Sequence, residues 1–191
     1  MKSLKNILFG KEFGIEKQIA FVGLFNAGKT TLVKRIKGEE EIDTTYHPTM
    51  GLSMETFKIG TFEVVAADLG GQKSFQESFW KPFCEGSAAV VFVFDSADEK
   101  RVDEAGIALK KVLGWIPDNC IFLFLANKMD LDNALALEEI IKKLKLKDIS
   151  SKSPHPFGIY QISALMQSNL EEPISWLSEQ LSKYSSQEET P

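Results

Sequence analysis

The chain has 191 residues, of which 43% are hydrophobic and 26% are charged, and its formal net charge is -5 at pH 7. This length fits one domain with a substantial core, and the mild acidity argues against a general nucleic-acid binder, which needs clustered positive charge. No apolar run approaches the roughly 20 residues that cross a bilayer, and the two cysteines, Cys84 and Cys120, make no disulfide framework, so we expect a reduced, cytoplasmic protein.

Residues 1–14, MKSLKNILFGKEFG, form an amphipathic segment ahead of the first strand-like run. Leu4, Ile7 and Leu8 share one helical face and the lysines lie mostly off it, which is typical of a short helix at a membrane interface. The alternative is a helix that packs permanently on the domain. Lys2 stands where N-myristoylation requires glycine, so we expect no acyl chain to assist membrane binding. Either a weak peripheral membrane contact or a structural role fits this segment.

Short apolar runs alternate with longer helical patterns along the rest of the chain. The runs that indicate strands are 18–22, 62–68, 88–95, 120–127 and 158–163. Several are apolar on both faces, as strands between two helix layers must be. Apolar residues recur at helical spacing in three places: Val102, Ala105, Leu109 and Val112; Leu137, Ile140, Ile141 and Leu144; Leu170, Ile174, Leu177 and Leu181. This α/β alternation predicts right-handed βαβ units and a mostly parallel sheet.

The stretch 52–68 departs from this alternation. Its two strand-like pieces are joined only by Ile59 and Gly60, which is too short for a crossover, so they must form an antiparallel hairpin. We expect one domain over residues 15–184, followed by a polar, flexible tail over 185–191.

Residues 23–30, GLFNAGKT, match the pattern G-x-x-x-x-G-K-[ST] between a strand-like run and a helix-like run. Such a turn can wrap its backbone N–H groups around a β-phosphate, and the helix that follows adds its positive end. Lys29 would reach the β- and γ-phosphates, and the Thr30 hydroxyl would bind Mg²⁺. We therefore predict that this stretch binds a nucleotide phosphate through Gly23, Asn26, Ala27, Gly28, Lys29, Thr30 and Thr31.

Two later stretches indicate which base the nucleotide carries. Asn127, Lys128 and Asp130 follow an apolar strand, at the edge where α/β sheets bind ligands. The Asp130 carboxylate can accept hydrogen bonds from N1–H and the 2-amino group of guanine, whereas adenine offers no donor at either place. Lys128 can lie along the purine face. After the next strand come Ser163 and Ala164, and the Ala164 N–H could meet the guanine O6. Together these residues predict a guanine nucleotide.

Residues suited to Mg²⁺ and the γ-phosphate lie in two further loops. Asp68 ends a strand and can hold Mg²⁺ through water, the Gly71 N–H can touch the γ-phosphate, and Gln72 can orient the attacking water. Thr49 can supply the second protein ligand to Mg²⁺. The alternatives are a surface glutamine and an ordinary loop threonine. Because both loops extend from a rigid sheet, losing the γ-phosphate would release them.

The motifs GLFNAGKT, HPT, DLGGQ, NKMD and SA, in this order, resemble those of the Ras superfamily of small GTPases. The details DLGGQ, NAGKTT and NLEEPISWLSEQL narrow the resemblance to the Arf/Sar branch over about residues 15–184. The resemblance implies a six-stranded P-loop G domain that cycles between GDP and GTP with Mg²⁺. It also implies an exchange factor, a GTPase-activating protein, an effector on the switch and interswitch surface, and a hairpin that shifts register. By analogy we expect a role in membrane traffic or membrane organisation.

Three features depart from this branch. Phe25 stands where Arf and Sar proteins carry an acidic residue beside the γ-phosphate. Ala67 stands where Arf proteins carry the exposed tryptophan of the hairpin, with Leu52 and Phe83 at the other two positions of that effector patch. The second switch, residues 72–80, is one residue longer than usual. These departures bear on which effectors and activators the protein uses.

Two functions remain open at this point. One is a GTP-hydrolysing switch, and the other is a non-cycling, GTP-bound structural subunit that resembles the β subunit of the signal-recognition-particle receptor. Gln72 and Thr49 favour the first, and Phe25 favours the second. The chain's two arginines, Arg35 and Arg101, lie outside the switch stretches, so we expect no arginine finger in cis and slow, activator-dependent hydrolysis. We expect a cytoplasmic protein that reaches a membrane surface in its GTP form.

Overall fold

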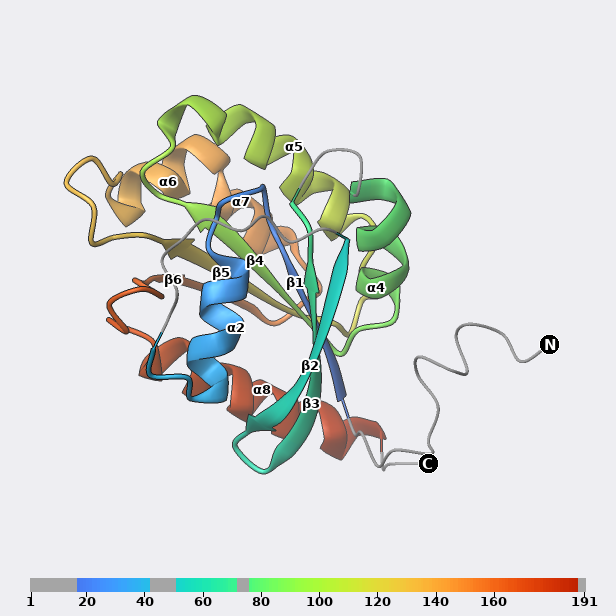
Figure 1. Ribbon diagram of the computed structural model, residues 1–191. Coiled ribbons are helices and arrows are strands. Elements are labelled where there is room, and N and C mark those ends of the chain that lie inside the picture. Colours follow the sequence, from blue (N-terminus) through green and yellow to red (C-terminus); the bar gives the residue numbers. More distant parts are fainter. Residues whose placement is uncertain (1–16, 42–50, 72–75, 189–191) are drawn as a thin grey trace.

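The computed structural model describes residues 17–41, 51–71 and 76–188, which fold into an α/β unit (Figure 1). Its strands are β1 (Lys17–Val22), β2 (Leu52–Ile59), β3 (Phe62–Leu69), β4 (Ala89–Asp95), β5 (Ile121–Asn127) and β6 (Phe157–Gln161). Its helices are α2 (Lys29–Lys37), α4 (Lys81–Glu85), α5 (Val102–Leu113), α6 (Leu137–Leu144), α7 (Leu146–Lys152) and α8 (Glu171–Glu188), with a π-helical turn η2 (Gln76–Trp80) and a 3-10 turn η3 (Glu99–Arg101).

The strands form a six-stranded sheet in the order β2-β3-β1-β4-β5-β6. β3, β1, β4, β5 and β6 run parallel, and β2 pairs with β3 antiparallel. The hairpin predicted for 52–68 and the mostly parallel sheet are therefore both confirmed. The fold is that of a small G domain.

Helices cover both faces of the sheet, as the apolar strands predict. α4, α5, α6 and α7 pack on one face, over a core that contains Phe92, Phe94, Phe122 and Phe124. α2 and α8 cover the other face, where they meet the alternate residues of the same strands. In Figure 1, α2 crosses in front of the sheet and α8 runs below it, whereas α5 and α6 lie above it. Among the described residues, no helix is long and apolar enough to cross a membrane.

Two boundaries differ from the sequence prediction by two residues or more. β6 ends at Gln161 rather than at residue 163, because Ser163 leaves the strand and pairs with Ser168 across a short turn. α8 continues to Glu188, so the predicted domain end at residue 184 falls inside a helix. Its last turns contain serine, glutamine and glutamate with no glycine or proline to stop them. The predicted segment 1–14 lies outside the described residues.

Trp80 anchors the chain that follows β3. Its side chain is fully buried, and its indole Nε1 donates a hydrogen bond to the Gly70 carbonyl at 3.0 Å. The Gly70 N–H in turn donates to the Gly51 carbonyl at 2.8 Å. The tryptophan therefore fixes the residues that lead from the sheet to the candidate site.

We predict that Trp80→Phe lowers the free energy of unfolding by about 1–3 kcal/mol, since it leaves the buried Gly70 carbonyl without its donor and removes packed volume. Trp115→Phe is the matched control, because Trp115 lies only half-buried at the margin of the same core. Urea unfolding at a fixed excess of GDP and Mg²⁺ measures the free energy of unfolding of both variants under the same conditions. Equal losses for the two variants would contradict this account of Trp80.

Candidate nucleotide-binding site

The predicted site residues gather where the parallel strands end. The loop 23–28 follows β1, Asp68 is the penultimate residue of β3, Asp95 ends β4 and Asn127 ends β5. Carboxyl ends of neighbouring parallel strands are the edge at which open α/β sheets bind ligands. The sheet therefore assembles residues from four separate stretches of the chain at one place.

The loop after β1 has the shape of an anion cradle. Gly28 has φ 90°, and a Cβ there would stand 2.3 Å from the Asn127 side-chain nitrogen, so only glycine fits. Asn26 is also left-handed, with φ 61°. In the described parts of the chain, no acceptor contacts the backbone N–H of Asn26 or Gly28, and no side chain caps the start of α2 at Lys29. These groups suit a bound phosphate.

Lys29 lies inside this loop. Its side chain is 5% exposed, and its Nζ donates to the carbonyls of Gly23 and Leu24 at 3.0 and 3.1 Å. Burial lowers the pKa of Lys29 to about 8, the negative charge of Asp68 opposes that shift, and the positive charge of Arg101 adds to it. The lysine is thus held by the loop, where an anionic phosphate would favour its charged form.

Thr30 and Asp68 supply the oxygen atoms suited to a metal ion. The Thr30 hydroxyl donates to Asp68 Oδ2 at 2.5 Å, and Asp68 is buried opposite Phe21 of β1. Mg²⁺ prefers oxygen ligands and keeps several waters, so one hydroxyl and one carboxylate beside a phosphate loop fit this ion. Thr49, the other predicted ligand, lies outside the described residues.

Gly71 lies directly against the phosphate loop. Its carbonyl accepts a hydrogen bond from the Phe25 N–H at 3.1 Å. A Cβ at Gly71 would stand 2.2 Å from the Phe25 nitrogen and 2.4 Å from the Leu24 carbonyl carbon, so the close approach requires glycine. Gly71 therefore lies against the phosphate loop, its contact with a γ-phosphate stays a prediction, and Gln72 lies outside the described residues.

Asn127 joins the phosphate loop to the loop after β6. Its side chain is 2% exposed; Nδ2 donates to the Ala27 carbonyl at 2.8 Å and Oδ1 accepts from the Ala164 N–H at 2.9 Å. The Ala164 N–H, predicted to meet guanine O6, therefore has Asn127 as its acceptor in this structure. Ser163 is buried and exchanges both backbone hydrogen bonds with Ser168. Asp130 is exposed in the turn after β5.

Lys128 is held by an acidic residue that the sequence analysis did not identify. Its Nζ lies 2.7 Å from Asp95 Oδ2, and Asp95 Oδ1 accepts the Ala97 N–H at 3.0 Å. The ammonium group is fixed at the end of β4, so the apolar stem of Lys128 is the part left to face a purine. Asp95 could have been found from the sequence, because it ends an apolar strand just as Asp68 and Asn127 do.

Arg35 makes backbone contacts that no pattern in the sequence indicated. It lies in the last turn of α2. Its guanidinium donates to the carbonyls of Ala164 and Leu165 at 3.3 and 2.9 Å, and to those of Glu39 and Glu40 at 2.9 and 2.6 Å. It therefore ties the predicted base-binding loop to the end of α2.

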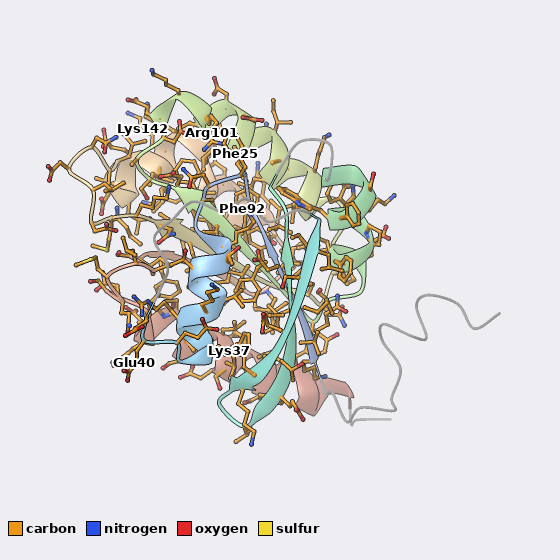
Figure 2. The ribbon with its side chains drawn as sticks, in the orientation of Figure 1. Phe25, Lys37, Glu40, Phe92, Arg101 and Lys142 are labelled. Atoms are coloured by element: carbon orange, nitrogen blue, oxygen red, sulfur yellow. The ribbon has the colours of Figure 1, made fainter. Side chains whose placement is uncertain are left out.

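Arg101 contacts the phosphate loop itself. Nη1 and Nη2 each donate to the Phe25 carbonyl at 3.1 Å, and the guanidinium carbon lies 4.2 Å from the centre of the Phe25 ring. Figure 2 shows the two side chains next to each other at the end of the sheet where β1 leads into the loop. The sequence analysis did not foresee this contact, because the two residues are 76 positions apart.

The positions implied as an effector patch are not an exposed aromatic surface here. Ala67 and Phe83 are buried, and Leu52 is half-buried against the same core as α4 and α5. The small Ala67 side chain lies within the sheet, where it contributes to that core. An effector of this protein would therefore need contacts beyond these three residues.

Comparison with known proteins agrees with this geometry. A family model described as the ADP-ribosylation factor family matches residues 3–181. The chain is 38% identical over 163 residues to ADP-ribosylation factor-like protein 2 of Dictyostelium discoideum, with 85% of each chain covered. It is 36% identical over 169 residues to ADP-ribosylation factor-like protein alp41 of Schizosaccharomyces pombe, with 87% of each chain covered.

Solved structures give the same result. The Arl6 (BBS3) small GTPase of Trypanosoma brucei, solved with the bound nucleotide analogue GppNp, has a TM-score of 0.77 and 31% identity, over 88% of this chain and 98% of that chain. A chain of the mammalian SRP receptor has a TM-score of 0.71 over 86% of this chain and 100% of that chain, but its 24% identity shows the fold alone. Since the family match spans nearly the whole chain and the relatives match it over most of their own length, this chain belongs to the ADP-ribosylation factor family of small GTPases, which bind guanine nucleotides and hydrolyse GTP.

Proposed function

We propose that this protein is a molecular switch that binds GDP or GTP with Mg²⁺ and hydrolyses GTP slowly. The observation that carries the proposal is that the chain at and just after the end of β3 contacts both the phosphate loop and the first turn of α2. Asp68 accepts from Thr30, and Gly71 accepts from Phe25. A γ-phosphate held by this loop would therefore be sensed directly by the chain that leads into residues 72–75.

The chain's own residues divide the work of binding and hydrolysis. The N–H groups of the phosphate loop and the Lys29 ammonium bind the phosphates, and Thr30 with Asp68 would hold Mg²⁺. When bound, Mg²⁺ neutralises charge that develops on the transferred phosphoryl group. Gln72 orients the attacking water. The sheet fixes where these residues lie, and the loops make the contacts that change with the nucleotide.

Slow hydrolysis follows from the state of the two arginines. Arg35 uses its donors on four backbone carbonyls, and Arg101 uses three of its N–H nitrogens on Phe25 and Asp98. Neither is presented as a finger that reaches towards the γ-phosphate. A GTPase-activating protein that supplies an arginine would raise the rate by about 10³–10⁵. An exchange factor would similarly be needed to release GDP from a loop that is held on several sides.

The cellular role is proposed from the family alone. We infer that the protein is cytoplasmic, reaches a membrane surface in its GTP form through residues 1–14, and acts in membrane traffic or membrane organisation. The alternative of a non-cycling structural subunit gains no separate support, because the likeness to the SRP receptor extends to the fold only.

The first prediction from the proposed function concerns nucleotide choice. We expect Asp130→Asn to weaken GDP binding by roughly 10²- to 10⁴-fold, since two charge-assisted hydrogen bonds to guanine are lost, and to shift preference towards xanthine nucleotides. Asp132→Asn is the control, because it makes the same change two residues along in the same exposed stretch. Competition binding with GDP, XDP and ADP measures the effect. Wild-type protein that binds ADP as tightly as GDP would refute the guanine assignment.

The second prediction concerns catalysis. We expect Gln72→Leu to lower single-turnover GTP hydrolysis by about 10²-fold, because the attacking water loses its orienting group, while GTP affinity stays within a few-fold. Gln180→Leu, on α8 away from the phosphate loop, should hydrolyse at the wild-type rate. Measurements with and without cell extract separate the intrinsic rate from the activated one. Rapid hydrolysis by the purified protein that is insensitive to Gln72 would contradict the proposal.

The third prediction concerns the N-terminal segment. Lys2, Lys5 and Lys11 contribute only about 1 kcal/mol each on an anionic surface, so three or four apolar side chains, at about 1.5–3 kcal/mol each, must supply most of the binding. We expect weak, reversible binding to anionic liposomes that is stronger with a GTP analogue than with GDP and is lost when residues 1–13 are deleted. Flotation assays decide it. Equal binding of both forms, or no change on deletion, would mean a structural segment.

A further inference from the structure

Arg101 holds Phe25 in two ways at once. Its two terminal nitrogens donate to the Phe25 carbonyl at 3.1 Å each, and its guanidinium stacks on the Phe25 ring at 4.2 Å. The third guanidinium nitrogen, Nε, donates to Asp98 Oδ2 at 2.6 Å, which fixes the group to η3. The Arg101 side chain is 18% exposed, whereas Phe25 as a whole is 47% exposed. The arginine is therefore the fixed partner, and the loop residue is what it holds.

The carbonyl that Arg101 binds belongs to the peptide between Phe25 and Asn26. This peptide is trans, so its C=O and its N–H point in opposite directions. With the carbonyl turned towards Arg101, the Asn26 N–H points to the opposite side. Within the described residues nothing accepts a hydrogen bond from it, whereas the neighbouring Phe25 and Ala27 N–H groups donate to the carbonyls of Gly71 and Leu24. The Asn26 N–H is therefore available to an anion in this left-handed turn.

The positive charge of Arg101 also strengthens the hydrogen bond that this peptide's N–H can donate. A cation bound to the oxygen end of a peptide polarises the whole unit, because hydrogen bonds in a chain strengthen one another. The Asn26 N–H therefore becomes a stronger donor to an anion than an N–H whose carbonyl faces water. Phe25 also donates its own N–H to Gly71, so the group that Arg101 holds is connected to the chain after β3.

We propose that Arg101 is a positioning residue for the nucleotide phosphates. It holds the Phe25–Asn26 peptide so that the Asn26 N–H points towards the phosphates, and its positive charge strengthens that N–H as a donor. This inference rests on the proposed function, since it names how that same site retains its nucleotide. Arg101 acts through the loop backbone and makes no contact with the reacting atoms. Phe25 contributes its carbonyl and the ring on which the guanidinium rests.

The test is the dissociation rate of fluorescent GDP from the full chain, measured for Arg101→Gln and for the neighbouring Lys100→Gln. Both variants remove one positive charge from η3, but Lys100 is exposed, whereas Arg101 binds the Phe25 carbonyl of the phosphate loop. We expect Arg101→Gln to speed GDP release by about tenfold or more, as loss of a charge-assisted hydrogen bond implies. Lys100→Gln should stay within about twofold, and Arg101→Lys should recover part of the loss.

A second measurement separates positioning from support of the fold. We expect the Asn26 amide proton in the GDP complex to resonate at higher field in Arg101→Gln than in wild type or Lys100→Gln, because its hydrogen bond to phosphate weakens. A merely structural arginine would lower the unfolding midpoint and leave this resonance in place. If Arg101→Gln fails to fold, Phe25→Leu serves instead, since that exposed position keeps the carbonyl and loses the ring; GDP release should then rise several-fold.

The outcomes are distinguishable from those of the proposed function. Wild-type protein that binds no guanine nucleotide would overturn both. Wild-type protein that prefers GDP to ADP, together with Arg101→Gln that releases GDP at the wild-type rate and keeps the Asn26 resonance, would overturn the role of Arg101 alone. Equal acceleration by Lys100→Gln would also overturn it, because net charge on η3 would then explain the effect.

Discussion

A loop that offers its backbone N–H groups to a phosphate must be held by its other groups, and this constraint shapes the whole site. Asn127 holds the loop from the base side, since its Nδ2 binds the Ala27 carbonyl while its Oδ1 binds the Ala164 N–H. Arg101 holds the opposite side at Phe25. Both use carbonyl oxygens of the loop and none of its N–H groups. The cradle is therefore held on both sides while the N–H groups of Asn26 and Gly28 stay available to the ligand, which is what electrostatic preorganisation requires.

The parallel sheet makes this arrangement possible at modest length. β1, β4 and β5 end at one edge, so Asn127 and Asp95 come to lie beside the loop without any long connection. In the core behind them, the rings of Phe92 and Phe94 both stack on the ring of Phe124, with centre-to-centre distances of 5.8 and 6.0 Å respectively. A close-packed interior has low compressibility, so its side chains have little room to move. The site residues on the strand ends are consequently fixed by the core, and only the segments that leave the sheet are free to respond to the nucleotide.

Local patterns predicted the parts of the site that are built from consecutive residues. The glycines and lysine of the loop, the strand that ends at Asn127 and the hairpin over 52–68 follow from spacing and periodicity. Contacts between distant residues left no such pattern: Arg35 meets Ala164 across 129 positions, and Arg101 meets Phe25 across 76. An arginine at the end of a helix looks like a solvated charge in a sequence. Likewise, nothing before the fold was known could show that Asn127 is the acceptor of the Ala164 N–H.

The hairpin register connects the sheet to the phosphate. β3 pairs with β1 so that Asp68 lies opposite Phe21, and the contacts of Asp68 with Thr30 and of Gly71 with Phe25 depend on that pairing. A one-residue slip would turn the apolar face outwards, whereas a two-residue slip keeps each side chain on its face and moves the strand by about 6.6 Å. Such a slip would break both contacts together. The Lys37–Glu55 pair at 2.9 Å also joins α2 to the hairpin, but both side chains are exposed, and a surface ion pair contributes little to stability. The contacts of Asp68 and Gly71 therefore connect the β3 register to the phosphate loop and the start of α2, and the ion pair on the surface adds little to that connection.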